Sequence, residues 1–99
     1  MKMREVIKVL VEQAEQGGAG FHPFGGGLVV RVAKTPERGQ LMVTLERERV
    51  MPSNAEMDTV EREVRALGWE LAKEESPDWQ GYVCRRVIWF EKVKDEKTK

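Results

Sequence analysis

The sequence has very few residues of the kinds that build metal or disulfide sites. Its 99 residues include one cysteine, Cys84, and one histidine, His22. A single cysteine excludes an internal disulfide framework and agrees with a reducing compartment. A structural zinc site needs about four Cys or His ligands, and only these two are present. The sequence therefore predicts no metal site, and we find no motif for any other cofactor.

Long apolar runs and an excess of one charge are also missing. No run approaches the roughly 18 apolar residues of a membrane-spanning helix, and Met1 to Arg4 lead into an amphipathic pattern instead of a signal-peptide core. The 17 basic and 17 acidic side chains give a formal net charge of zero. Such a protein has no overall field that attracts nucleic acid or an anionic membrane. We therefore expect a cytoplasmic protein with no membrane contact, for which nucleic acid is a disfavoured partner.

Glycine, in contrast, is concentrated in one place. Six of the nine glycines lie in residues 17–27, GGAGFHPFGGG. The run from Gly18 begins as G-x-G-x-x but ends in proline and follows a helix, unlike a dinucleotide-binding loop. The spacing of a Walker loop begins at Gly20, but two glycines stand where lysine and a hydroxyl residue are required. We interpret the stretch as a connection that Phe21 and Phe24 anchor to the core.

Two segments have the apolar spacing of amphipathic helices. The first is predicted over residues 3–16, because its apolar residues recur at three and four positions and glycines follow it. The second begins with a capping box, formed by Ser53 as N-cap and Glu56 three residues later. We expect it to end at Gly68.

Four further segments, residues 27–34, 40–50, 69–74 and 82–93, have the composition and alternation of β-strands. A four-residue loop between the first two would place Thr35 opposite Gln40. The same register pairs Val32 with Val43 and Val30 with Leu45.

The element order is then α-β-β-α-β-β. We predict an α+β fold, a two-layer sandwich in which two helices cover one face of a four-stranded, mainly antiparallel sheet. Residues 1–93 should form a single domain, and residues 94–99 a flexible charged C-terminal tail.

Catalytic chemistry has little support in the sequence. Cys84 lies in an alternating apolar strand, which favours a small core residue over a reactive thiolate. The many glutamates fall on solvated helix faces and strand edges. We therefore assign no catalytic residue, and a small enzyme of unknown reaction is the second alternative to the interaction function predicted below.

The alternation of the strands predicts an apolar sheet face turned away from the helices. We place Trp69, Leu71, Cys84, Ile88 and Phe90 in the core. The opposite face then collects Val29, Arg31, Ala33, Met42, Thr44, Val83, Arg85, Val87 and Trp89. Exposed apolar patches that contain Trp, Met and Arg are typical of protein interfaces. The alternative is that the last strand twists so that both faces are covered within the monomer.

We therefore predict a small non-catalytic interaction module that uses the sheet face or edge. It would be a homodimer, or a regulatory adaptor or inhibitor of a larger protein. The predicted partner-binding residues are Arg31, Met42, Thr44, Arg85, Val87 and Trp89.

Binding of single-stranded nucleic acid is the alternative function, because sheet-based binders combine arginines with stacking aromatic rings. The residues for this alternative are Arg31, Arg85, Arg86, Trp79 and Tyr82. The zero net charge and the nearby Glu46, Glu70 and Glu74 argue against it.

Overall fold

The computed structural model describes residues 2–35 and 39–93 as two α-helices, six β-strands and a short 3-10 turn. The elements are α1 (Met3–Glu15), β1 (Ala19–Pro23), η1 (Gly25–Gly27), β2 (Val29–Lys34), β3 (Leu41–Glu48), α2 (Asn54–Arg65), β4 (Trp69–Glu74), β5 (Asp78–Gln80) and β6 (Val83–Lys92). The predicted tail over residues 94–99 lies outside the described residues.

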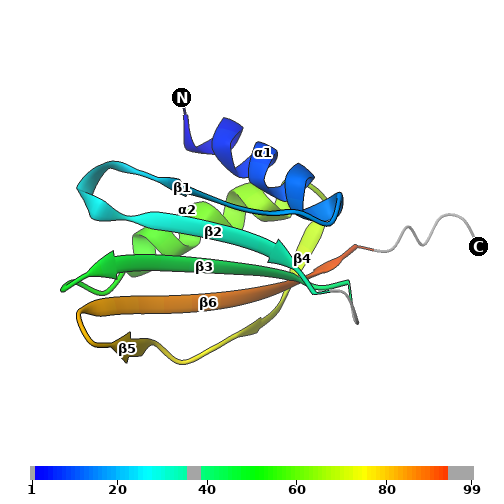
Figure 1. Ribbon diagram of the computed structural model, residues 1–99. Helices are drawn as coiled ribbons and strands as arrows, with labels where there is room; N and C mark the ends of the chain where they lie inside the picture. Colours follow the sequence, from blue (N-terminus) through cyan, green and yellow to red (C-terminus); the bar gives the residue numbers. More distant parts are fainter. Residues whose placement is uncertain (1, 36–38, 94–99) are drawn as a thin grey trace, which may run out of the picture.

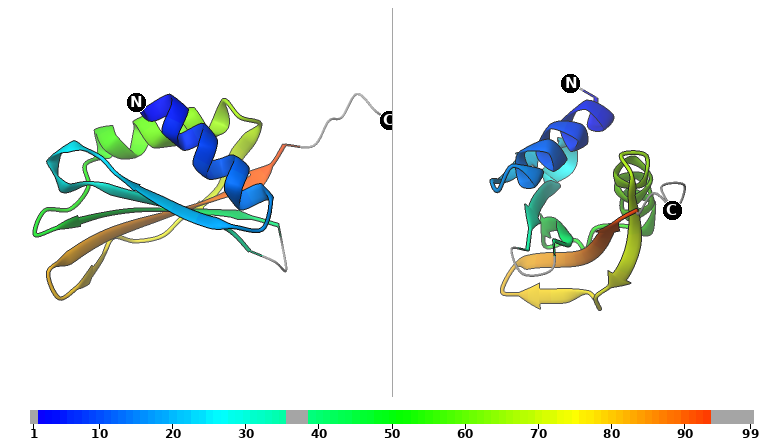
Figure 2. Two further views of the ribbon diagram at one scale, coloured as in Figure 1. Left: turned by 45° about the horizontal axis from the view of Figure 1, so that its top comes forward. Right: turned by 90° about the vertical axis from the view of Figure 1, so that its right-hand side faces the viewer.

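The strands form one antiparallel sheet in the order β1-β2-β3-β6-β4 (Figure 1). The short strand β5 pairs with the beginning of β6, while β4 pairs with its end, so both lie along the same side of β6. The two helices contact each other on one face of the sheet, where α1 packs on β1 and β2, and α2 packs next to β4. The sheet curls around this helical layer (Figure 2).

The α+β class and the antiparallel sheet are as predicted, but the predicted four strands and their order are wrong. The order is α-β-β-β-α-β-β-β, because the glycine-rich stretch contains β1 and the segment before β6 contains β5. Pairing with β2 organises β1 despite its weak strand composition. Gly20 serves a close approach here, since a Cβ atom would lie 2.7 Å from Oε1 of Gln13 and 3.0 Å from Cδ2 of Leu10. The stretch is therefore an edge strand beneath α1, not a plain connection.

Both helices begin where the sequence predicts, and α2 ends at Arg65, shortly before the predicted Gly68. The capping box at the start of α2 is complete: the Glu56 N–H donates to Oγ of Ser53 at 3.1 Å, and the Ser53 N–H donates to Oε1 of Glu56 at 2.8 Å. Gly68 follows α2 with a φ of +95°, a conformation that glycine adopts at little cost.

The β2–β3 hairpin has the predicted register. Val32 pairs with Val43 and Val30 with Leu45. The Thr35 N–H donates to the Gln40 carbonyl at 2.8 Å, which closes the hairpin. Residues 36–38 of the predicted loop lie outside the described residues.

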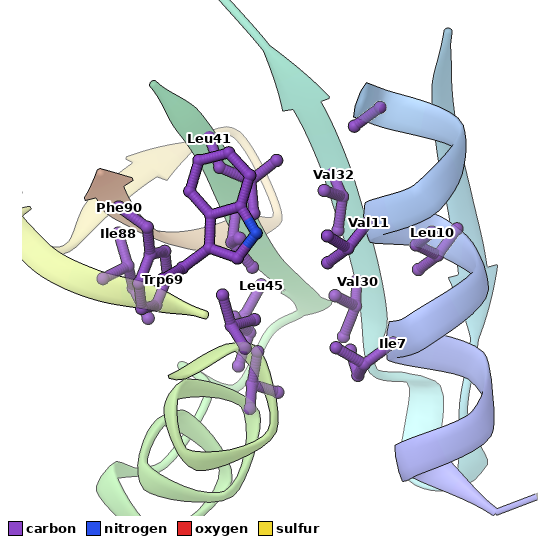
Figure 3. Packing of buried hydrophobic residues seen from close by; sticks show 14 of the residues in the cluster. Ile7, Leu10, Val11, Val30, Val32, Leu41, Leu45, Trp69, Ile88 and Phe90 are labelled. Atoms are coloured by element: carbon purple, nitrogen blue, oxygen red, sulfur yellow. The ribbon is translucent and has the colours of Figure 1, made fainter. Parts of the chain in front are cut away.

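The core lies between the helices and the inner face of the sheet (Figure 3). Ile7 and Val11 of α1 face Val30 and Val32 of β2, and Trp69 packs near Phe90 on the other side of the core. The prediction that Leu71 is buried is wrong: it is 41% exposed, because it lies on the edge strand β4 beside a register shift. No described helix is long and apolar enough to cross a membrane.

Candidate interaction surface

The face of the sheet turned away from the helices, here called the outer face, is built from cross-strand rows. The strand register joins Ala19, Ala33, Met42 and Trp89 into one line across β1, β2, β3 and β6, which we call the apolar row. The next line, the middle row, contains Phe21, Arg31, Thr44 and Val87. The third, the charged row, contains Val29, Glu46 and Arg85. Side chains within a row are neighbours, so the three rows form one continuous surface.

Exposure separates this face from the core. Phe21 is 60% exposed, and Met42, Val87 and Trp89 are half-buried. The inner face of the same strands is closed, since Val43 and Ile88 have no exposed surface. Within residues 2–35 and 39–93, no helix packs on the outer face.

Trp89 is held in place by two residues near the end of the neighbouring strand β4, Lys73 and Glu75. Its indole Nε1–H donates to Oε2 of Glu75 at 2.6 Å, and the Lys73 ammonium lies 5.8 Å from the ring centre. The hydrogen bond restricts the indole to one orientation. A pre-oriented aromatic side chain loses less entropy when a partner covers it.

A shallow hollow lies on the other side of β3 from Trp89. Its volume is about 210 Å³, and Ala19, Phe21, Arg31, Ala33, Met42 and Thr44 contribute to its lining. Sites for drug-sized ligands usually measure roughly 300–1,000 Å³, so this hollow is better matched to a single inserted side chain. Two of the lining residues, Ala19 and Ala33, have small side chains that fill little of it.

The two arginines of the outer face share one carboxylate. Arg31 donates from Nε to Oε1 of Glu46 at 2.5 Å, and Arg85 donates from Nε to Oε2 at 3.1 Å. Arg31 also stacks on Phe21, with 5.0 Å between Cζ and the ring centre. Arg85 in addition donates to Oε1 of Gln80 at 3.0 Å. Both guanidinium groups are therefore engaged within the chain.

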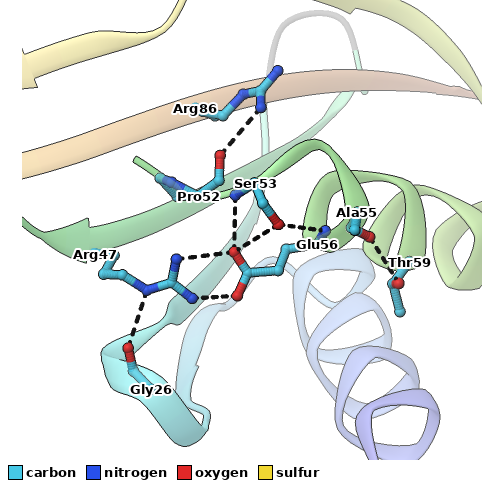
Figure 4. A network of polar contacts seen from close by, with 8 residues as sticks. All are labelled: Gly26, Arg47, Pro52, Ser53, Ala55, Glu56, Thr59 and Arg86. Carbon is cyan, nitrogen blue, oxygen red and sulfur yellow. Dashed lines mark hydrogen bonds and ion pairs between the residues drawn. The ribbon is translucent and has the colours of Figure 1, made fainter. Parts of the chain in front are cut away.

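Arg47 fastens the start of α2 to the inner face of the sheet (Figure 4). Its guanidinium forms a bidentate pair with Glu56, and its Nε donates to the Gly26 carbonyl at 3.0 Å. The hydrogen bond from Arg47 holds the pKa of Glu56 below its ordinary value, although burial opposes the shift. The same carboxylate completes the capping box with Ser53. Arg47 thus connects β3, the glycine-rich turn and α2.

Arg86 has a similar structural role one strand away. It donates to the Pro52 carbonyl at 3.2 Å (Figure 4). Its guanidinium donates to Oδ1 of Asn54 at 2.8 Å. It also donates to Oε2 of Glu74 at 3.1 Å. Arg86 is next to Arg85 in sequence but points to the helix side, because side chains alternate along a strand.

The six residues predicted to bind a partner lie together on the outer face. They occupy the apolar, middle and charged rows on β2, β3 and β6: Arg31, Met42, Thr44, Arg85, Val87 and Trp89. Thr44 is the most covered of them at 6% exposure, so its contribution is to the floor of the surface.

The five residues of the nucleic-acid alternative are divided between the two faces. Arg31 and Arg85 lie on the outer face, but Arg86 and Trp79 are on the helix side, where Trp79 pairs with Cys84. Tyr82 lies in the turn before β6, with the Arg49 guanidinium 5.4 Å from its ring centre.

Phe21 belongs to the surface but was not assigned to it from the sequence. Phe21 was expected to anchor the glycine-rich stretch to the core, and only Phe24 does so. No signal revealed Phe21, because β1 itself was not predicted. Glu46 was placed near this surface from the sequence, since it follows Met42 and Thr44 at the period of two that puts all three on one face.

A metal site is not found in the part of the chain that the structure describes. No three His, Cys, Asp or Glu side chains there are grouped so that they could hold a metal ion. Comparison with protein-family models, curated proteins and solved structures finds no match. Function must therefore be inferred from the chain's own residues.

Proposed function

We propose that the protein is a non-catalytic interaction module that binds another protein through the outer face. The observation that carries the proposal is the apolar row, with its partly exposed Met42 and Trp89 on a face that no described helix covers. Burial of apolar surface stabilises an association by about 25 cal/mol per Å² before its entropic costs. Trp, Met and Arg are also the residue types enriched in interface cores.

The charged row fits a protein partner better than a nucleic acid. Phosphate binding needs cationic groups that are free to replace counterions. Arg31 and Arg85 instead both bond to Glu46, which leaves much of their charge neutralised. When a protein partner covers such a network, each guanidinium keeps an opposite charge beside it, which lowers the cost of burial.

A photo-crosslinking amino acid at position 42 tests the proposal. The full chain with this probe is illuminated in the cells that produce it, and a matched variant carries the probe at Lys8, which is exposed on α1. We expect a discrete covalent adduct to a protein, whether a second copy or another chain, from position 42 but not from position 8. A folded probe variant that gives no adduct at position 42, or equal adducts at both positions, would contradict the proposal.

A further inference from the structure

We propose that the outer face binds a second copy of this chain, packed sheet on sheet around a twofold axis that runs along β3. This inference rests on the proposed function and specifies its partner. A twofold interface must be self-complementary, because the same surface is used by both copies. For an axis along β3, the side chains on one side of β3 must therefore fit those on its other side.

The apolar row has such a match. A half-turn about β3 places β6 of one copy over β2 of the other, while β3 faces itself. Met42 then meets Met42 of the partner subunit, and Trp89 meets the partner's Ala33. The largest side chain of the row thus lies opposite one of its smallest.

The hollow makes this match specific. It has a volume of about 210 Å³, and Ala33 and Met42 help to line it. Packed sheets lie about 10 Å apart, a gap that a large side chain opposite a small one fills well. Trp89 reaches this position already oriented by its hydrogen bond to Glu75. Trp89 is then the central anchor of the interface, and the hollow beside Ala33 is its socket.

The charged side chains are also compatible with this twofold arrangement. Glu46 meets its own copy across the axis, and two carboxylates in contact would repel each other. Each Glu46, however, already binds Arg31 and Arg85, so positive groups flank both carboxylates. The rotation also places Arg85 over the partner's Val29, which avoids a contact between two arginines.

Sedimentation analysis of the purified full chain over a wide concentration range tests this arrangement. We expect a reversible dimer. Trp89→Ala removes the anchor and Ala33→Trp fills the socket, so each should raise the dimer Kd at least about 30-fold, the effect of an interface hot spot. Val9→Asp is the control, since Val9 is 44% exposed on α1, and it should leave Kd unchanged. Circular dichroism and thermal melting establish that each variant is folded.

The outcomes separate this inference from the proposed function. The inference is overturned if the chain stays monomeric. In that case the probe at position 42 would capture a different protein, or the chain would bind a single-stranded oligonucleotide at low salt. A second outcome is that Met42→Asp dissociates the dimer while Ala33→Trp, although folded, leaves it intact. The outer face would then still be the interface, but the twofold axis along β3 would be wrong. A dimer that Val9→Asp dissociates and Met42→Asp does not would overturn both.

Discussion

Trp89 and Phe90 are neighbours in β6, yet they belong to different environments. Phe90 has no exposed surface and packs in the core beneath the helices. Trp89 is half-buried on the outer face and is restrained by Glu75 and Lys73 instead of by a packed layer. The same strand therefore presents apolar side chains on both faces, of which the described chain covers one. The inner face of β6 therefore supplies folding energy, whereas its outer face leaves Trp89 partly exposed on the surface that we propose for association.

The arginines of the inner and outer faces also differ in their partners and in their exposure. Arg47 and Arg86 on the inner face bind the start of α2 and are largely covered, with side chains 15% and 12% exposed. Arg31 and Arg85 on the outer face bind one carboxylate near the apolar row. Substitutions on the inner face should therefore act on stability, and those on the outer face mainly on association.

The largest effect is expected for Phe90→Ala. It leaves a cavity in the core and should lower the free energy of unfolding by about 3–5 kcal/mol. Trp89→Ala, measured where the chain is dilute and monomeric, should lower it by less, about 1–2 kcal/mol, because the indole keeps part of its surface in water and its removal leaves no closed cavity. Urea denaturation of both variants measures the difference. Equal losses would show that the outer face is packed like the core.

The next largest effect is expected for Glu56→Ala. This change removes the bidentate pair with Arg47 and half of the capping box, and it should lower the free energy of unfolding by about 2–3 kcal/mol. Glu61→Ala is the matched control on α2, since Glu61 pairs with an Arg65 side chain that is 59% exposed. The control should lose about 0.3–0.5 kcal/mol. A loss as small as the control's would mean that Arg47 does not anchor α2.

The pH dependence of unfolding should reveal the same contact with a smaller effect. Arg47 holds the pKa of folded Glu56 below its ordinary value of 4.5, so folding favours the deprotonated carboxylate. The resulting stability is fully present above pH 4.5 and is lost as the pH falls through the lower, folded pKa. Glu56→Gln should therefore lose less stability than the wild type on acidification from neutral pH. Parallel curves for the two proteins would rule out this contribution.

The smallest effect on stability is expected for Arg31→Ala on the outer face. The Arg31 side chain is 53% exposed, and exposed ion pairs contribute about 0–1 kcal/mol. Without Arg31, only Arg85 remains to offset the repulsion between the two Glu46 carboxylates across the proposed twofold axis. The main consequence should therefore be weaker self-association. If Arg31→Ala lowered the free energy of unfolding of the monomer by more than about 2 kcal/mol, Arg31 would be a structural residue like Arg47.

Much of the fold follows from local signals in the sequence. The capping box placed the start of α2, and the alternation around the hairpin gave the pairing of Val30 with Leu45. Alternation also placed Met42 and Trp89 on a shared face, since it depends only on the period of a strand.

The missed features depend on contacts between distant segments. β1 and β5 are short and contain glycine, proline or polar residues, so neither resembles a strand until its partner is present. The position of Phe21 on the outer face followed from β1 and was missed with it. Arg47 lies in a segment predicted as a strand, but its contact with Glu56 requires the packing of α2 against the sheet.

The most direct test of the central claim, that a second copy covers the outer face, is the reactivity of a thiol placed at Met42→Cys. The natural Cys84 is fully buried and should remain unreactive. Reaction of the introduced thiol with a maleimide is followed from dilute to concentrated protein, with Val9→Cys as the exposed control. We predict that the thiol at position 42 becomes protected as concentration rises, while the control reacts at one rate throughout. Equal and constant reactivity at both positions would contradict the claim.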